Sequence, residues 1–115
     1  MRGKIGLEEH FAIPETLLDS KGFLAAETWP ELEQRLMDIQ HRRIELMDRH
    51  GIEMMILSLN APAVQAIADT KKAIAVAKAA NDSLAEHVRM HPDRFAGFAA
   101  LPIDARRVRF DALVA

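Results

Sequence analysis

"GIEMMILSLNAP", residues 51–62, is the stretch that decides the fold class. Residues 52–59 are almost continuously apolar, and only Glu53 and Ser58 interrupt them. A short apolar run between Gly and Pro boundaries is typical of a strand that is buried on both faces, as strands of parallel sheets are. The stretch therefore predicts a parallel sheet with this strand inside it.

Helical patterns flank this strand on both sides. Residues 31–50 predict one helix, because apolar side chains recur at helical spacing, Pro30 suits its start and Gly51 suits a left-handed cap at its end. A second helix is expected over residues 70–90, with Asp69 as its N-cap. Strands that alternate with helices of this length indicate β-α-β units with right-handed crossovers.

Two further apolar runs complete the pattern, and they predict strands over residues 4–10 and 95–101. Asp104 could cap a third helix, within which the chain stops. These units could form a small open sheet, or they could be the first third of a barrel. The end in mid-helix favours the barrel, so we expect an α/β fold made of the first β/α units of a truncated (β/α)₈ (TIM) barrel, with residues 1–115 forming one incomplete domain.

The composition excludes several function classes. The net charge is −2 and no basic cluster stands out, which argues against nucleic acid and acidic membranes as partners. No stretch approaches the ~20 apolar residues of a membrane span. The chain has no cysteine, so it can form neither a disulfide nor a thiolate metal site, and a cytoplasmic location is expected.

The first strand ends on three polar groups, Glu8, Glu9 and His10. Simple alternation places Glu8 and His10 on one face with Cα atoms ~6.6 Å apart, close enough for both side chains to bind one metal ion. Ligands also gather at the carboxyl ends of parallel strands. An E-x-H pair is a short motif, however, and the alternative is a polar strand end that merely enters a loop.

Other polar residues have simpler interpretations. His87 and His91 share a helix face and could share a metal, but a surface position near the helix C-terminus is the favoured interpretation. Asn81 lies on an apolar stripe and is expected to bond backbone atoms in the core. "HRR", residues 41–43, is interpreted as a solvated helix face. Residues 11–30 form a long irregular connection, which is typical of binding loops.

Four stretches carry a resemblance to a known family. They are "GLEEHFAIPE" (6–15), "HGIEMMILSLNAPAVQAI" (50–67), "AKAANDSLAE" (77–86) and "HPDRFAGFAALP" (91–102). Together they resemble the N-terminal part of the amidohydrolase-type decarboxylases of hydroxylated benzoates. The resemblance implies a (β/α)₈ barrel, one divalent metal ion (Zn²⁺ or Mn²⁺), a homo-oligomer (a tetramer in the family), and non-oxidative decarboxylation of 2,6-dihydroxybenzoate to resorcinol and CO₂.

The resemblance also assigns roles to single residues. Glu8 and His10 match the metal-binding E-x-H of the family, and Phe23 matches an aromatic side chain that lies against the ring of a small aromatic carboxylate substrate. Ser58 and Asn60 fall on the rim where the substrate binds. The later His and Asp metal ligands and the proton-donating acid have no counterpart here, so no catalytic residue is expected within this chain.

Two alternatives remain open. The first is a metal-dependent hydrolase of the same superfamily, but most of those carry H-x-H, and the anionic Glu8 would make the metal a poorer Lewis acid. The second is a catalytically inactive, truncated fragment. Its unfinished sheet would expose an edge and apolar faces that promote self-association.

Overall fold

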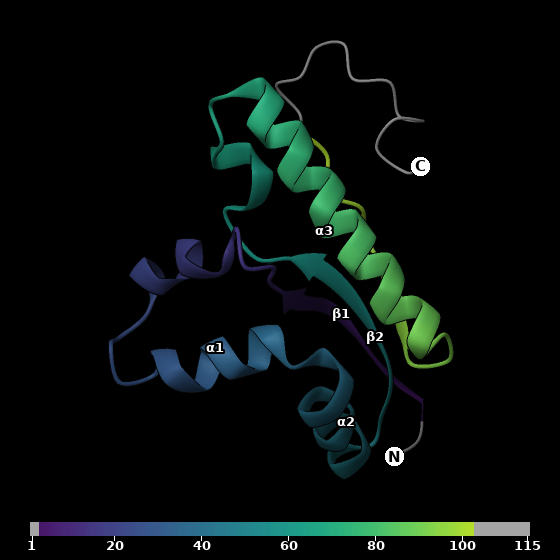
Figure 1. The fold of residues 1–115 in the computed structure, drawn as a ribbon. Helices are drawn as coiled ribbons and strands as arrows, with labels where there is room; N and C mark the ends of the chain where they lie inside the picture. The colour runs from purple at the N-terminus through teal and green to yellow at the C-terminus, as the bar shows by residue number, and fades with distance from the viewer. Residues whose placement is uncertain (1–2, 103–115) are drawn as a thin grey trace.

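The computed structural model describes residues 3–102 (Figure 1). The strands are β1 (Lys4–Phe11), β2 (Ile52–Leu59) and β3 (Phe95–Gly97). The α-helices are α1 (Trp29–Met37), α2 (Ile44–His50) and α3 (Thr70–Met90). Shorter helical segments are η1 (Leu17–Phe23, 3₁₀), η2 (Ile39–Arg43, π) and η3 (Ala63–Ala66, 3₁₀).

The three strands form one parallel sheet in the order β1-β2-β3, which confirms the predicted α/β class. The strand order does not reverse, so right-handed crossovers bring both connecting helices to the same face, as in a barrel. The core bears this out, because Met47 of α2 and Ala77 of α3 belong to one buried cluster with Leu57 of β2. We call this the covered face of the sheet, and the opposite one the open face.

The prediction that β2 is buried on both faces is wrong for the part of the chain that the structure describes. Met55, Leu57 and Leu59 are buried, whereas the alternating Ile56 and Ser58 are only half-buried. The reason is that the described helices pack on one face alone. The strand therefore carries more apolar side chains than residues 3–102 bury.

The prediction of a single helix over residues 31–50 is also wrong. Helix α1 ends at Met37, and Asp38 leaves the helical conformation with φ −91° and ψ 84°. Its carboxylate accepts hydrogen bonds from the backbone N–H groups of His41 (3.0 Å) and Arg42 (3.2 Å). An aspartate side chain that bonds nearby backbone competes with the helical ladder, and here it begins the π-helical turn η2 that leads into α2. The left-handed cap at Gly51 is confirmed (φ 67°).

Helix α3 has the predicted bounds. The Asp69 carboxylate accepts a hydrogen bond from Lys72 N at 2.7 Å, which confirms the N-cap. Asn81 also behaves as predicted, since its side chain donates to Ala100 O (3.1 Å) and accepts from Ala100 N (2.7 Å). These two hydrogen bonds draw the backbone at Ala100 toward α3, which explains why β3 is shorter than predicted. The helix expected after Asp104 lies outside the described residues.

Candidate metal centre

Strand β1 departs from simple alternation just before its polar end. Gly6 pairs with Met55 and Glu9 pairs with Leu57, so the two residues Leu7 and Glu8 stand opposite the single residue Ile56. This is a β-bulge, and bulges commonly redirect side chains near functional sites. The sequence pattern did not indicate it, because a bulge is visible only in the pairing with the neighbouring strand.

The three polar side chains at the end of β1 lie in two different environments. Glu8 and His10 are exposed, and His10 pairs with the half-buried Ser58 of β2. Glu9, between them, is half-buried and lines a cavity of about 260 Å³ together with Arg43 and other side chains from the helical layer. Glu8 and His10 are therefore accessible at the carboxyl end of their strand, whereas Glu9 lies in the cavity beside the helices.

The donor chemistry of Glu8 and His10 fits a divalent metal ion. A carboxylate oxygen and a neutral imidazole nitrogen both suit zinc or manganese. Among residues 3–102 there is no cluster of three or more His, Asp or Glu side chains that could hold a metal ion. A catalytic zinc typically has three protein ligands and one water, so Glu8 and His10 alone would be an incomplete ligand set.

A half-buried arginine, whose Nη1 atom is fully buried, lies behind this strand end. Arg43 Nη2 donates to the backbone carbonyl of His10 at 2.7 Å and to that of Arg35 at 2.6 Å. Burial lowers the pKa of Arg43 from its ordinary value, and the nearby Glu9 carboxylate partly opposes this change. The interpretation of residues 41–43 as a solvated helix face is thus wrong for Arg43. The missing signal was the helix break at Asp38, which changes the direction of the following turn.

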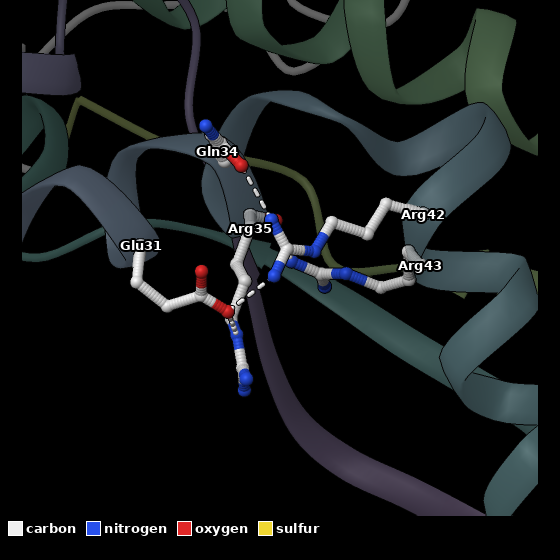
Figure 2. Close-up of polar contacts among 5 residues, drawn as sticks. All are labelled: Glu31, Gln34, Arg35, Arg42 and Arg43. Atoms are coloured by element: carbon white, nitrogen blue, oxygen red, sulfur yellow. Dashed lines mark hydrogen bonds and ion pairs between the residues drawn. The ribbon is translucent and has the colours of Figure 1, made fainter.

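The neighbouring Arg42 has a different environment. Figure 2 shows Arg42 reaching back toward α1, where it contacts Gln34 and Glu31. Glu31 also accepts a hydrogen bond from Arg35 Nε at 2.8 Å. The bonds from Arg35 and Arg42 lower the pKa of the exposed Glu31 carboxyl. The hydrogen bonds of this cluster link α1 to η2.

Asn60 ties the long first loop to the end of β2. It is buried, its Oδ1 accepts from the Thr16 hydroxyl (2.7 Å), and its Nδ2 donates to Thr16 O (2.9 Å) and to Ser20 Oγ (2.7 Å). Its backbone N–H also donates to Phe11 O. These contacts give Asn60 an internal role in positioning residues 11–20. Direct substrate binding by Asn60 and by Ser58 stays a prediction.

The first loop also carries the predicted aromatic residue. Phe23 ends η1 and is 72% exposed. Leu18, one of the first residues of the same 3₁₀ segment, is likewise exposed. An apolar surface of this kind contributes little to the core and is available to a ligand.

His87 is half-buried and not at the surface as expected. Its Nδ1 lies 2.6 Å from Gln40 Nε2, and its ring meets Phe11 edge-to-face with 6.0 Å between centroids. Burial lowers the pKa of His87, the Arg43 charge lowers it further, and Glu86 opposes both. His91 instead packs edge-to-face against Phe95, so the two histidines have separate partners.

Known proteins resemble this chain in both sequence and structure. The chain is 66% identical over 103 residues to the gamma-resorcylate decarboxylase of Rhizobium radiobacter, covering 90% of this chain and 32% of that one. A solved 2,6-dihydroxybenzoate decarboxylase complexed with 2,6-dihydroxybenzoate superposes with a TM-score of 0.89 at 62% identity, covering 97% of this chain and 33% of the other. No protein-family model matches the chain.

A third match concerns the metal. The dihydroxybenzoic acid decarboxylase of Polaromonas sp. JS666, solved with bound manganese and the inhibitor 2-nitroresorcinol, has a TM-score of 0.87 at 66% identity and covers 90% of this chain and 31% of that one. These matches confirm the resemblance to the amidohydrolase-type hydroxybenzoate decarboxylases. Among them, the chain is similar in particular to gamma-resorcylate decarboxylase. The chain spans about a third of the length of these relatives.

Within residues 3–102, none of the helices combines the length and the apolar character needed to cross a membrane.

Proposed function

We propose that this chain is the metal-binding part of a non-oxidative decarboxylase that converts 2,6-dihydroxybenzoate to resorcinol and CO₂. The observation that carries the proposal is the exposed pair Glu8 and His10 at the carboxyl end of β1. The similarity to gamma-resorcylate decarboxylases supports the reaction and the substrate class. Residues 1–115 would form part of a larger barrel domain, which would function as a cytoplasmic homo-oligomer, a tetramer by the resemblance.

Glu8 and His10 would be two of the ligands of one divalent metal ion. Manganese is proposed first, because the Polaromonas relative was solved with it, and zinc suits the same donors. When bound, the metal supplies a Lewis acid that holds the substrate carboxylate and an ortho hydroxyl in place. Glu8 and His10 orient this centre and transfer no proton. The group that protonates the ring carbon, before the carbon–carbon bond breaks and CO₂ leaves, is proposed to lie outside the described residues.

The remaining predicted residues would shape the substrate pocket. Phe23 would lie against the aromatic ring and exclude water, which its high exposure allows. Ser58 would contact the substrate beside His10, its partner across the strands. Asn60 would act mainly by holding the loop that carries Phe23, through its bonds to Thr16 and Ser20.

A hybrid enzyme tests the proposal. In this hybrid enzyme, residues 1–102 of the present chain replace the matching third of the Rhizobium radiobacter relative. We expect CO₂ release from 2,6-dihydroxybenzoate, and we expect Glu8→Gln and His10→Ala to abolish both the activity and the retention of manganese on dialysis. Glu53→Gln is the matched control, since Glu53 is exposed near the start of β2, at the opposite end of the sheet from Glu8 and His10, and it should retain both properties. Full activity in the His10→Ala hybrid, or ester hydrolysis in place of CO₂ release, would contradict the proposal.

A second candidate applies to the 115-residue chain by itself. Because residues 3–102 contain no cluster of three or more candidate ligands, the isolated chain should bind metal weakly and have no decarboxylase activity. Metal analysis after dialysis and a CO₂-release assay, each run beside the hybrid enzyme, distinguish this inactive form from a self-sufficient enzyme. Stoichiometric metal with turnover in the isolated chain would show that it completes the site itself.

A further inference from the structure

We infer that Arg43 is a positioning residue for His10, acting through the backbone of β1. The inference rests on the proposed role of His10 as a metal ligand. Its basis is a pair of hydrogen bonds, because Arg43 Nη2 binds His10 O at 2.7 Å and Arg35 O at 2.6 Å. One guanidinium group thus joins the candidate ligand's own peptide group to the last turns of α1.

The π-helical turn η2 explains how Arg43 reaches this position. The turn begins at Asp38, whose carboxylate bonds the N–H groups of His41 and Arg42. Within it, Arg42 extends toward Gln34 and Glu31 on the surface (Figure 2), whereas Arg43 turns toward β1. Isolated π-helical turns occur frequently at functional sites, where they displace one side chain from its regular helical direction.

The burial of Arg43 needs a compensating reason. Removing a guanidinium from water is costly, and one of its nitrogen atoms, Nη1, is buried without a hydrogen-bond partner among residues 3–102. The Glu9 carboxylate offsets part of the charge. An apolar side chain could fill the same space without these costs. What it could not do is donate two hydrogen bonds that hold the His10 carbonyl against α1.

The consequence for the candidate site is geometric. The imidazole of His10 is exposed and makes no hydrogen bond that would fix its direction among the described residues, so its backbone position determines where the ring can lie. Outer partners of metal ligands typically change metal affinity 10- to 100-fold when they are removed. Since Arg43 acts on the backbone of His10, we expect its loss to weaken metal binding by about 10-fold.

The test is a manganese titration of the full 115-residue chain, followed by paramagnetic line broadening of its backbone amide signals. Broadening detects weak binding and locates it, so it suits a site with two ligands. The variants are Arg43→Met, Arg43→Lys and the matched control Arg42→Met, whose side chain makes its hydrogen bonds to Gln34 and Glu31. Melting temperatures are recorded in parallel, and each titration is run well below the lowest of them.

In the unmodified chain, the Glu8 and His10 amides should broaden first. Arg43→Met should raise the manganese concentration needed for this broadening by about 10-fold. The concentration needed for Arg43→Lys should lie between those for the unmodified chain and Arg43→Met. Arg42→Met should need the same concentration as the unmodified chain. Should Arg43→Met fail to fold, Arg43→Lys decides the result. Unchanged affinity in the folded Arg43 variants, or an equal loss in Arg42→Met, would overturn the positioning role.

A further variant separates this inference from the function on which it rests. His10→Ala should abolish the broadening at Glu8. If His10→Ala leaves that broadening unchanged, the metal site itself is wrong. If His10→Ala abolishes it while both Arg43 variants bind normally, the metal site stands and only the role of Arg43 is wrong.

Discussion

The two faces of the sheet differ in what they contribute. On the covered face, the exposed fractions of Leu57 and Phe95 are 0% and 1%, and both side chains pack with the helices in one cluster. On the open face, Ile5 and Leu7 are 56% and 62% exposed. The candidate ligands are exposed as well, so their substitution should have little effect on folding. The difference indicates that stability depends on the covered face, whereas the candidate chemistry belongs to the strand end that the helices leave uncovered.

Adjacent residues of β2 provide the strongest test of this comparison. Leu57→Ala removes a fully buried side chain and should reduce the free energy of unfolding by about 2–5 kcal/mol. Ile56→Ala changes a half-buried side chain on the open face, one residue earlier, and should reduce the free energy of unfolding much less. Urea denaturation of both variants measures the difference. Equal losses would show that the open face is packed against something in solution.

Two glycines test how tightly the covered face is packed. A Cβ added at Gly97 would lie 2.5 Å from Leu84 Cδ1 and 2.7 Å from Leu84 Cγ. Because the Leu84 side chain is buried and would have to shift to make room, Gly97→Ala should cost about 1–3 kcal/mol. Gly22→Ala is the control, as nothing lies within 4 Å of its added Cβ. Thermal unfolding compares the two, and a fully stable Gly97→Ala variant would mean that α3 packs more loosely against β3.

The pH dependence of stability reports on the helical layer. The pKa of His87 is lowered in the folded state, mainly by burial, so the unfolded chain binds more protons just below its ordinary value of about 6.5. Stability should therefore be full above that pH and fall as the pH drops below it. Protonation would also place a hydrogen on Nδ1, where the Gln40 amide already donates.

Urea denaturation between pH 8 and pH 5 measures this loss. In His87→Gln the fall over this range should be reduced. A profile that is the same in His87→Gln and in the unmodified chain would show that the burial of His87 contributes nothing to the pH dependence.

The sequence predicted the elements whose signals are local. The bounds of β2 and α3 and the caps at Gly51 and Asp69 follow from residues next to one another, and the structure confirms them. Features that depend on distant contacts were missed. The helix break required Asp38 to prefer its own side-chain bonds to the helical ladder.

The same limit applies to the candidate site. The sequence singled out Glu8 and His10, because polar groups at a strand end are a local pattern. It could not indicate the bulge at Leu7 and Glu8, which exists only in the pairing with β2. The burial of Arg43 was missed for a related reason, since its partner His10 lies 33 residues away in the sequence.

The smallest effect on stability is expected for Phe23, which is 72% exposed. Phe23→Ala should change the free energy of unfolding by no more than about 0.5 kcal/mol, yet in the hybrid enzyme it should raise KM for 2,6-dihydroxybenzoate. Phe11→Ala is the contrasting variant, because Phe11 is 1% exposed and its removal should destabilise the fold strongly. A large loss of stability in Phe23→Ala would make it a core residue.

The most direct measurement is the anomalous diffraction of manganese in crystals of the hybrid enzyme. We expect one strong anomalous peak within coordination distance of both the Glu8 carboxylate and the His10 imidazole, with Glu9 pointing away from it. In crystals of the His10→Ala hybrid the peak should be lost or greatly weakened. A peak that contacts neither Glu8 nor His10, or one that is undiminished in His10→Ala, would contradict the metal centre at the end of β1.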